Sequence, residues 1–185
     1  MVASKAPDLP ETLTRLRNEG EPFVCLDGTL IRTDRVAARD PETAYHLWYS
    51  GKHKAFGGNV QVVTDHTGFP VWASPVEPGS SHDITAARQH ALPALYRAAS
   101  QGLETLADKG YQGAGAGVLT PVKGTRPCPD DATYNHVQTA LRAPAERANA
   151  MLKQFKALRH VSLDPSTITS IAATALVIIA LNHQP

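Results

Sequence analysis

The chain has 185 residues, a length that allows one domain with a sizeable core and leaves little room for a second. Hydrophobic residues make up 42% of it and aromatic residues 6%, which is typical of an ordinary globular fold. Lysine and arginine number 18 against 17 aspartates and glutamates, so the net charge of +1 excludes a polybasic tail protein and an acidic disordered coat.

The first predicted elements are a helix, a strand and a loop. Leucines at helical spacing, followed by a glycine, predict a short helix, and residues 1–22 are assigned to this helix and a linker. Residues 23–31 form an apolar run interrupted by one acid, which predicts a strand that carries a carboxylate. Residues 32–54 are polar and mixed in charge, so we expect a loop there.

A hairpin and a helix come next. Residues 59–64 and 69–76 predict two strands, and Asp65-His66-Thr67-Gly68 between them is typical of a hairpin turn. A helix is predicted from about 82 to 99, with Ser81 as its capping residue.

The second half of the chain predicts two short strands and two helices, over 103–107, 118–122, roughly 136–159, and from about 166 to the end. The first of these strands ends at Asp108, and Pro144 predicts a break in the longer helix. This order of strands and helices indicates an α/β fold in which a mixed sheet is flanked by helices.

Cysteine content and hydropathy predict the compartment. Cys25 and Cys128 cannot form a disulfide framework, which favours a reducing compartment. The first twenty residues carry charges and prolines where a signal peptide needs an apolar stretch. The most apolar segment, 168–181, is shorter than the about 20 residues of a membrane span, and predicts a buried helix. We expect a cytoplasmic protein with no membrane partner.

Three acids stand out by their context. Asp27 lies inside an apolar strand, Asp108 ends another strand, and Glu146 lies in a basic helix. Carboxylates from two strands and a helix can converge on hard divalent cations such as Mg²⁺, and a pair of such ions can act on a phosphodiester. A hydrogen-bonded turn acid is the alternative for Asp27.

The helix around Glu146 carries a basic face. Arg142, Glu146, Asn149 and Lys153 follow one another at offsets of four, three and four residues, so they lie along one side of a helix. A carboxylate there can reach a metal while the cations reach phosphates. The alternative is a surface pair of Arg142 and Glu146 that contributes a few tenths of a kcal/mol.

A competing motif is a phosphatase signature. Asp27-Gly28-Thr29-Leu30 resembles the end of the DxDGTL motif of haloacid-dehalogenase-type phosphatases, whose nucleophilic aspartate lies two residues earlier. Cys25 occupies that position here, so the attacking carboxylate is missing.

Six motifs occur in the order known from one family: LDGTLI at 26–31, YSGKHK at 49–54, PGSSHD at 78–83, LADKGYQG at 106–113, TPVKG at 120–124 and ERANAMLK at 146–153. With them the chain resembles the catalytic domain of DDE transposases from bacterial insertion sequences. The group is the one similar to insertion-sequence family five and the eukaryotic PIF/Harbinger elements. The resemblance runs from Leu9 to about Arg159.

The resemblance implies a ribonuclease-H-like fold for residues 23–185 and a catalytic, metal-binding triad of Asp27, Asp108 and Glu146. It implies two Mg²⁺ or Mn²⁺ ions, with Asp27 bridging both and the other two acids each completing one site. The implied activity is that of a DDE endonuclease: cleavage of DNA at transposon ends and joining of the freed 3′-hydroxyl to target DNA.

The resemblance also implies which basic residues contact DNA phosphates. Arg142 and Lys153 match the signature of the family, and Lys52, Lys54 and Lys123 are weaker candidates. Two positions stay without a role at this point: Thr139 takes the place of the signature tyrosine, and Asp83 ends the PGSSHD motif.

The resemblance extends to partners and place. Relatives carry a helix-turn-helix domain ahead of the segment that corresponds to Leu9, so we expect a separate helix-turn-helix subunit and a dimer or higher oligomer on DNA. The expected location is the bacterial cytoplasm, at the nucleoid when DNA is bound. The alternative function is a non-catalytic transposase remnant that binds DNA or an intact transposase.

Overall fold

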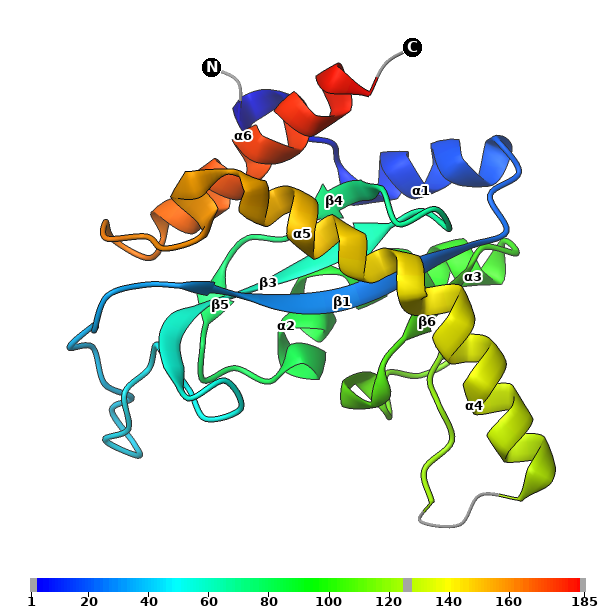
Figure 1. The fold of residues 1–185 in the computed structure, drawn as a ribbon, viewed down its shortest axis with the longest axis horizontal. Helices are drawn as coiled ribbons and strands as arrows, with labels where there is room; N and C mark the ends of the chain where they lie inside the picture. The colour runs from blue at the N-terminus through cyan, green and yellow to red at the C-terminus, as the bar shows by residue number, and fades with distance from the viewer. Residues whose placement is uncertain (1–2, 125–127, 184–185) are drawn as a thin grey trace.

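The computed structural model describes residues 3–124 and 128–183 (Figure 1). The elements of its first half are the 3₁₀-helix η1 (Ala3–Lys5), α1 (Leu9–Asn18), β1 (Phe23–Arg32), β2 (Tyr49–Ser50), β3 (Ala55–Thr64), β4 (Pro70–Ala73), β5 (Glu77–Pro78), α2 (Asp83–His90) and α3 (Leu92–Ser100). The second half contains β6 (Glu104–Ala107), η2 (Lys109–Tyr111), β7 (Val118–Leu119), α4 (Pro129–Arg142), η3 (Ala143–Ala145), α5 (Glu146–Gln154), η4 (Lys156–Leu158) and α6 (Thr167–Asn182).

Within these residues one seven-stranded mixed sheet forms, with β1 inside it. Strand β1 pairs antiparallel with β3 and parallel with β6, and β7 follows β6 in parallel. Strands β2, β4 and β5 all pair antiparallel with β3. The predicted α/β class, a mixed sheet flanked by helices, is confirmed.

The two faces of the sheet are covered by different helices. On one face Val24 and Leu26 of β1 belong to a core cluster with the buried leucines of α1 and α3. On the other face Ile31 packs in a cluster with α5 and α6. Side chains of a strand alternate between faces, which explains why residues 24 and 26 lie in one cluster and residue 31 in the other. In Figure 1, α5 crosses in front of β1 while α2 lies behind the sheet.

The helix α1 packs into the same cluster as β1 through Leu9, Leu13 and Leu16. The helix itself lies where the leucine spacing predicts it. The division of the chain between residues 22 and 23 stays a prediction.

The helix predicted over 82–99 is two helices. Its break lies at Ala91, and Pro93 in the first turn of α3 has no N–H to donate to the preceding turn. The expected cap at Ser81 is wrong as well. His82 is the N-cap residue of α2, without a side-chain capping bond, and the carbonyl of Ser81 instead accepts from Asn59 Nδ2 at 3.1 Å.

The helix predicted over 136–159 also differs in its ends. It begins earlier, at Pro129, after an N-cap at Cys128 whose sulfur accepts from a backbone N–H of the first turn. The break at Pro144 is confirmed, because η3 separates α4 from α5 there. The strands predicted over 69–76 and 118–122 are shorter than expected, as β4 and β7.

The apolar C-terminal segment is the predicted buried helix, α6 (Thr167–Asn182), and it packs on the sheet through Ile168, Ala172 and Ala175. Among the residues that the structure describes, no helix combines the length and apolar character needed to cross a membrane.

Candidate active site

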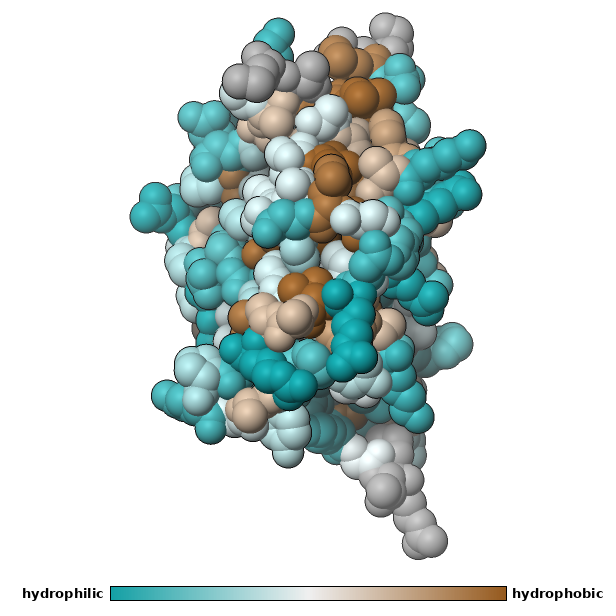
Figure 2. All heavy atoms as spheres, turned by 90° about the vertical axis from the view of Figure 1, so that its left-hand side faces the viewer, coloured by the Kyte–Doolittle hydropathy of each residue, from teal (hydrophilic) through white to brown (hydrophobic). Residues whose placement is uncertain are grey.

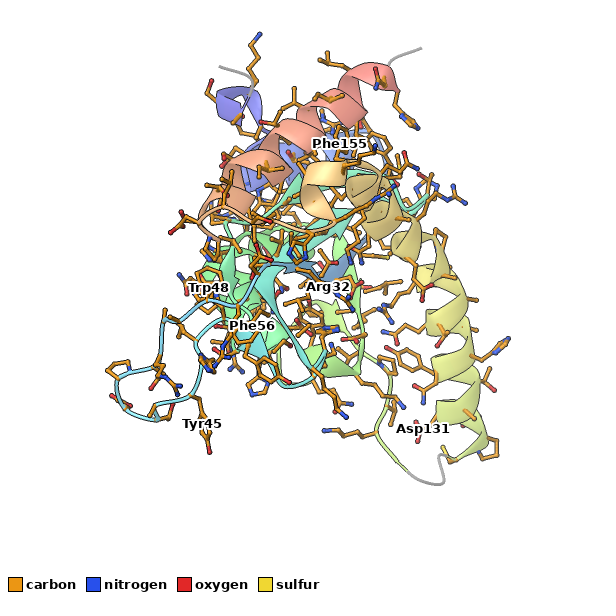
Figure 3. All side chains as sticks on the ribbon, turned by 60° about the vertical axis from the view of Figure 1, so that its left-hand side comes forward. Arg32, Tyr45, Trp48, Phe56, Asp131 and Phe155 are labelled. Atoms are coloured by element: carbon orange, nitrogen blue, oxygen red, sulfur yellow. The ribbon has the colours of Figure 1, made fainter. Side chains whose placement is uncertain are left out.

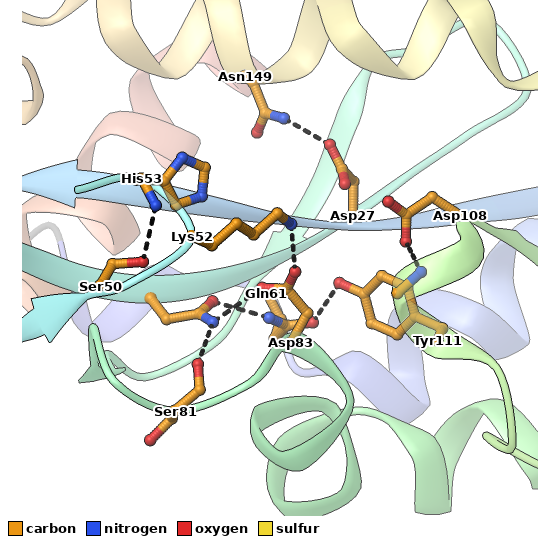
Figure 4. A network of polar contacts seen from close by, with 12 residues as sticks. Asp27, Ser50, Lys52, His53, Gln61, Ser81, Asp83, Asp108, Tyr111 and Asn149 are labelled. Atoms are coloured by element: carbon orange, nitrogen blue, oxygen red, sulfur yellow. Dashed lines mark hydrogen bonds and ion pairs between the residues drawn. The ribbon is translucent and has the colours of Figure 1, made fainter. Parts of the chain in front are cut away.

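The parallel pairing of β1 with the end of β6 brings Asp27 and Asp108 together. Leu26 and Ala107 are partners in the parallel pairing, and each acid is the next residue of its chain segment. Figure 4 shows the Asp27 carboxylate on the α5 side of β1 and the Asp108 carboxylate beside the same strand. Because β6 ends at Ala107, β1 continues from Asp27 to Arg32 with β3 as its only strand neighbour among the described residues.

Asp27 is held from the helix above it. Asn149 Nδ2 of α5 donates to Asp27 Oδ2 at 2.8 Å, as Figure 4 shows. Burial raises the pKa of Asp27 and the nearby charge of Asp108 raises it further, while Arg142 and Asn149 act in the opposite direction. Two carboxylates close together in a partly buried site favour the binding of a cation, which relieves their repulsion.

Asp108 is oriented by the turn that follows it. Gly110 N donates to Asp108 Oδ1 at 2.8 Å and closes the turn into η2. A Cβ atom on Gly110 would lie 2.9 Å from that oxygen, so a residue without a side chain suits this position. The carboxylate of Asp108, the second acid of the site, is therefore held by a tight turn directly after a buried strand.

Glu146 is the first residue of α5 and lies at the junction with α4. A small cavity of about 120 Å³ opens there, lined by Asp27, Thr139, Arg142, Ala143, Ala145 and Glu146. This cavity brings Glu146 and Asp27 to one space, although Glu146 itself is exposed. Asp108 is not among its lining residues.

The chemistry of the donor set fits a hard divalent cation at Asp27 and Asp108, since Mg²⁺ prefers carboxylate oxygens. Two buried polar atoms at the same place lack a hydrogen-bond partner among the described residues, Arg142 Nε and Asn149 Oδ1. The structure does not gather the three acids into one ligand cluster: residues 3–124 and 128–183 contain no group of three acids, histidines or cysteines close enough to hold a metal.

The predicted phosphate contacts on α4 and α5 lie beside these acids. Arg142 lines the cavity with Asp27, and its charge lowers the pKa of that carboxyl. Lys153 is half-buried, and its pKa is lowered by burial and by the neighbouring charge of Arg32.

The other three predicted lysines lie on loops. Lys54 is exposed just before β3, and Lys123 is exposed after β7. Lys52 lies closer to the acids. Its Nζ forms an ion pair with Asp83 Oδ2 at 2.8 Å, and this hydrogen bond raises the pKa of Lys52, which the charges of Asp108 and Asp27 raise further.

Asp83, left without a role by the sequence, heads a chain of polar side chains (Figure 4). Asn59 Nδ2 donates to Asp83 Oδ1 at 2.9 Å, and Gln61 Nε2 donates to Asn59 Oδ1 at 2.9 Å. Tyr111 OH then donates to Gln61 Oε1 at 2.7 Å. This series of contacts connects Lys52 with Tyr111 of η2, the turn that follows Asp108.

This chain of polar residues was missed by the sequence reasoning, although a signal exists. Asn59 and Gln61 alternate with valines along β3, so two buried amides lie on one face of an apolar strand. Buried polar side chains of this kind need partners, and here they find them in each other.

Cys25 occupies the position where a phosphatase would carry its nucleophile. Its side chain is 2% exposed, and burial raises its pKa to about 11. A buried, protonated thiol is not an attacking group, so the structure gives the phosphatase hypothesis no nucleophile at that position.

Comparison with known proteins gives one match. A protein family described as "DDE superfamily endonuclease" matches residues 26–183 of the chain. Neither the curated proteins nor the solved structures contain a match.

Proposed function

The chain belongs to the DDE superfamily of endonucleases, and we propose that it is the catalytic domain of a transposase that cleaves DNA at transposon ends and joins the 3′-hydroxyl to target DNA. The observation that carries the proposal is the adjacency of Asp27 and Asp108. The two aspartates are 81 positions apart in the sequence, yet they follow directly on the last paired residues of β1 and β6, Leu26 and Ala107.

The proposal assigns metal binding to Asp27, Asp108 and Glu146. Two divalent ions, Mg²⁺ or Mn²⁺, would supply Lewis-acid stabilisation of the attacking and leaving oxygens of the phosphodiester. Asn149 orients Asp27 by its hydrogen bond, and the backbone of Gly110 orients Asp108. Glu146, the first residue of α5, lines one small cavity with Asp27.

DNA is the substrate and partner in this proposal. Arg142 and Lys153 lie on the side of α4 and α5 near Asp27, where a phosphate bound at the acids would meet a positive charge. Lys52, Lys54 and Lys123 extend this role to the loops. A separate helix-turn-helix subunit and an oligomer on DNA are part of the proposal and rest on the family resemblance.

Cleavage of transposon-end DNA with Mg²⁺ or Mn²⁺ tests the proposal. The variants Asp27→Asn, Asp108→Asn and Glu146→Gln remove one charge each, and each is expected to lower the rate about a hundredfold or more, since metal-ion stabilisation is worth several kcal/mol. Glu104→Gln is the matched control, because Glu104 is an exposed acid on the same strand that leads to Asp108. Equal rates in the wild type and all variants would contradict the assignment.

The alternative, a non-catalytic remnant that binds DNA or an intact transposase, is favoured by one observation: three acids are not gathered into a ligand cluster in the described residues. Calorimetric titration with Mn²⁺ separates the two functions. Binding that Asp27→Asn abolishes supports the nuclease, and absence of binding by the wild type supports the remnant.

A further inference from the structure

A second and larger cavity opens at Lys52 and Asp83, between residues 45–53 and 79–83. Its volume is about 540 Å³, within the range of roughly 300–1,000 Å³ that holds small organic ligands. Aromatic rings, histidines and one lysine characterise its lining: Tyr45, His46, Tyr49, Lys52, His53 and His82.

The aromatic wall of this cavity is built on Phe56. Tyr49 and His46 each meet the Phe56 ring edge-on, with ring centroids 5.2 Å and 5.3 Å apart. These contacts hold two rings in place, yet Tyr49 remains 39% exposed and Tyr45 76% exposed. In Figure 3, Tyr45 projects outward from its loop while Phe56 lies against the body of the molecule. Fixed rings with exposed surface suit a flat, aromatic ligand.

Lys52 connects this cavity with the candidate active site. It lines the cavity, and its ammonium group pairs with Asp83, which lines it too. The hydrogen bond to Asp83 raises the pKa of Lys52, and the charges of Asp108 and Asp27 raise it further. All three of these aspartates therefore lie within electrostatic reach of the lysine. The side chain of Lys52 is 62% exposed and can accept an anion from solvent.

We propose that this cavity binds one unpaired nucleotide of the DNA strand, with the base against Tyr49 and His46 and the phosphate at Lys52. The position of that strand rests on the proposed function, because the acids determine where DNA passes. A base inside a duplex has both faces covered by its neighbours, so only an unpaired or extruded base can enter a cavity of this kind.

The character of the surrounding surface favours a nucleotide over a protein partner. Figure 2 faces the side that carries residues 33–48, and its lower part is largely hydrophilic, broken by isolated hydrophobic residues. The buried core of a protein interface is more apolar than the rest of the surface and poor in charged residues. Separate rings beside a lysine and histidines match a base and its phosphate instead.

Fluorescence of 2-aminopurine in DNA tests the proposal without any need for cleavage. The full chain is titrated, in EDTA, into a single-stranded oligonucleotide that carries the base analogue and into the matched duplex. Stacking on a tyrosine is expected to quench the single strand more than the duplex. Tyr49→Ala is expected to weaken binding of the single strand about tenfold or more and to remove the quenching, since stacking is worth about 1–3 kcal/mol per base.

Three further variants make the result specific. Tyr49→Phe keeps the ring and is expected to keep the quenching. Tyr96→Ala is the matched control, because Tyr96 is also 39% exposed but lies on α3, away from this cavity. Tyr45→Ala removes a side chain that is 76% exposed, so it tests the cavity without disturbing the core, and it too is expected to reduce the quenching.

The outcomes separate this proposal from the proposed function. Equal quenching in wild type, Tyr49→Ala and Tyr45→Ala, or none in the wild type, would overturn the nucleotide cavity even if metal-dependent cleavage is observed. Quenching that depends on Tyr49 in a protein that cleaves nothing with Mg²⁺ would support the cavity and count against the nuclease.

Discussion

At Gly28, β1 lies close against Asp83, the first residue of α2. A Cβ atom there would lie 2.5 Å from Asp83 Oδ1 and 3.0 Å from Gln61 Nε2, which is closer than non-bonded atoms tolerate. The absence of a side chain at Gly28 thus allows Asp83 to take the place from which it binds Lys52. A methyl group at residue 28 would therefore interfere with the hydrogen bonds that link Asp83, Asn59 and Gln61.

We predict that Gly28→Ala destabilises the protein by about 1–3 kcal/mol, the usual cost of a methyl group forced into a filled space. The urea midpoint at unchanged slope measures it. Gly51→Ala is the control, because a Cβ atom at Gly51 meets nothing within 4 Å, and its cost should stay within about 0.5 kcal/mol. Equal midpoints for the two variants would show that Asp83 moves aside freely.

The acids differ in how clearly the sequence around them marks them as candidate site residues. Asp27 and Asp108 stand out because a charge within or directly after an apolar strand is unusual, and the parallel pairing of β1 and β6 makes them neighbours. Asp83 is the first residue of α2, a position where an acid is common. Only the tertiary contacts with Lys52 and Asn59 give it a place in the site.

The turn between β3 and β4 packs against the junction of α4 and α5, which carries Glu146. Gly68 in this turn has φ of +84°, and a Cβ atom there would lie 2.0 Å from the carbonyl oxygen of Pro144. Two elements that are distant in the sequence therefore meet backbone to backbone. Pro144 lies two residues before Glu146, so the contact with the turn helps to position the backbone of Glu146.

Gly68→Ala is predicted to be more destabilising than Gly113→Ala. Both glycines have positive φ, +84° and +81°, but a Cβ atom at Gly113 meets nothing within 4 Å. Gly113→Ala should cost about 1–2 kcal/mol from the left-handed backbone alone, and Gly68→Ala a further 1–3 kcal/mol or so from the clash. Urea unfolding measures the difference. Identical costs would mean that the turn does not support the α4–α5 junction.

Periodicity foretells the longer helices and strands but not their ends, nor the two-residue strands β2 and β5. The sequence before Pro144 predicts a helix from about 136. Helix α4 nevertheless begins at Pro129, where the proline suits the first turn and Cys128 accepts a backbone N–H. Local capping contacts of this kind decide where a helix begins, and the pattern of hydrophobic residues gives no information about them.

The sheet assembles the candidate site from three distant parts of the chain. Strand β1 supplies Asp27, the end of β6 supplies Asp108, and the start of α5 supplies Glu146 with Asn149 one turn later. In the unfolded chain these groups are far apart, so a divalent cation has no comparable site there. Metal binding is therefore expected to stabilise the folded state as a whole.

We predict that saturating Mn²⁺ raises the melting temperature of the wild type. At one hundred times the dissociation constant the stabilisation is about 2.7 kcal/mol, which corresponds to roughly 5–10 °C for a domain of this size. Asp27→Asn should melt at a higher temperature than the metal-free wild type, because it removes a partly buried charge beside Asp108, and should show little further shift with Mn²⁺. Glu104→Gln, an exposed position on β6, should respond to Mn²⁺ as the wild type does. Differential scanning calorimetry with and without metal measures all three proteins. A shift of equal size in Asp27→Asn and the wild type would place the cation elsewhere and remove Asp27 from the metal site.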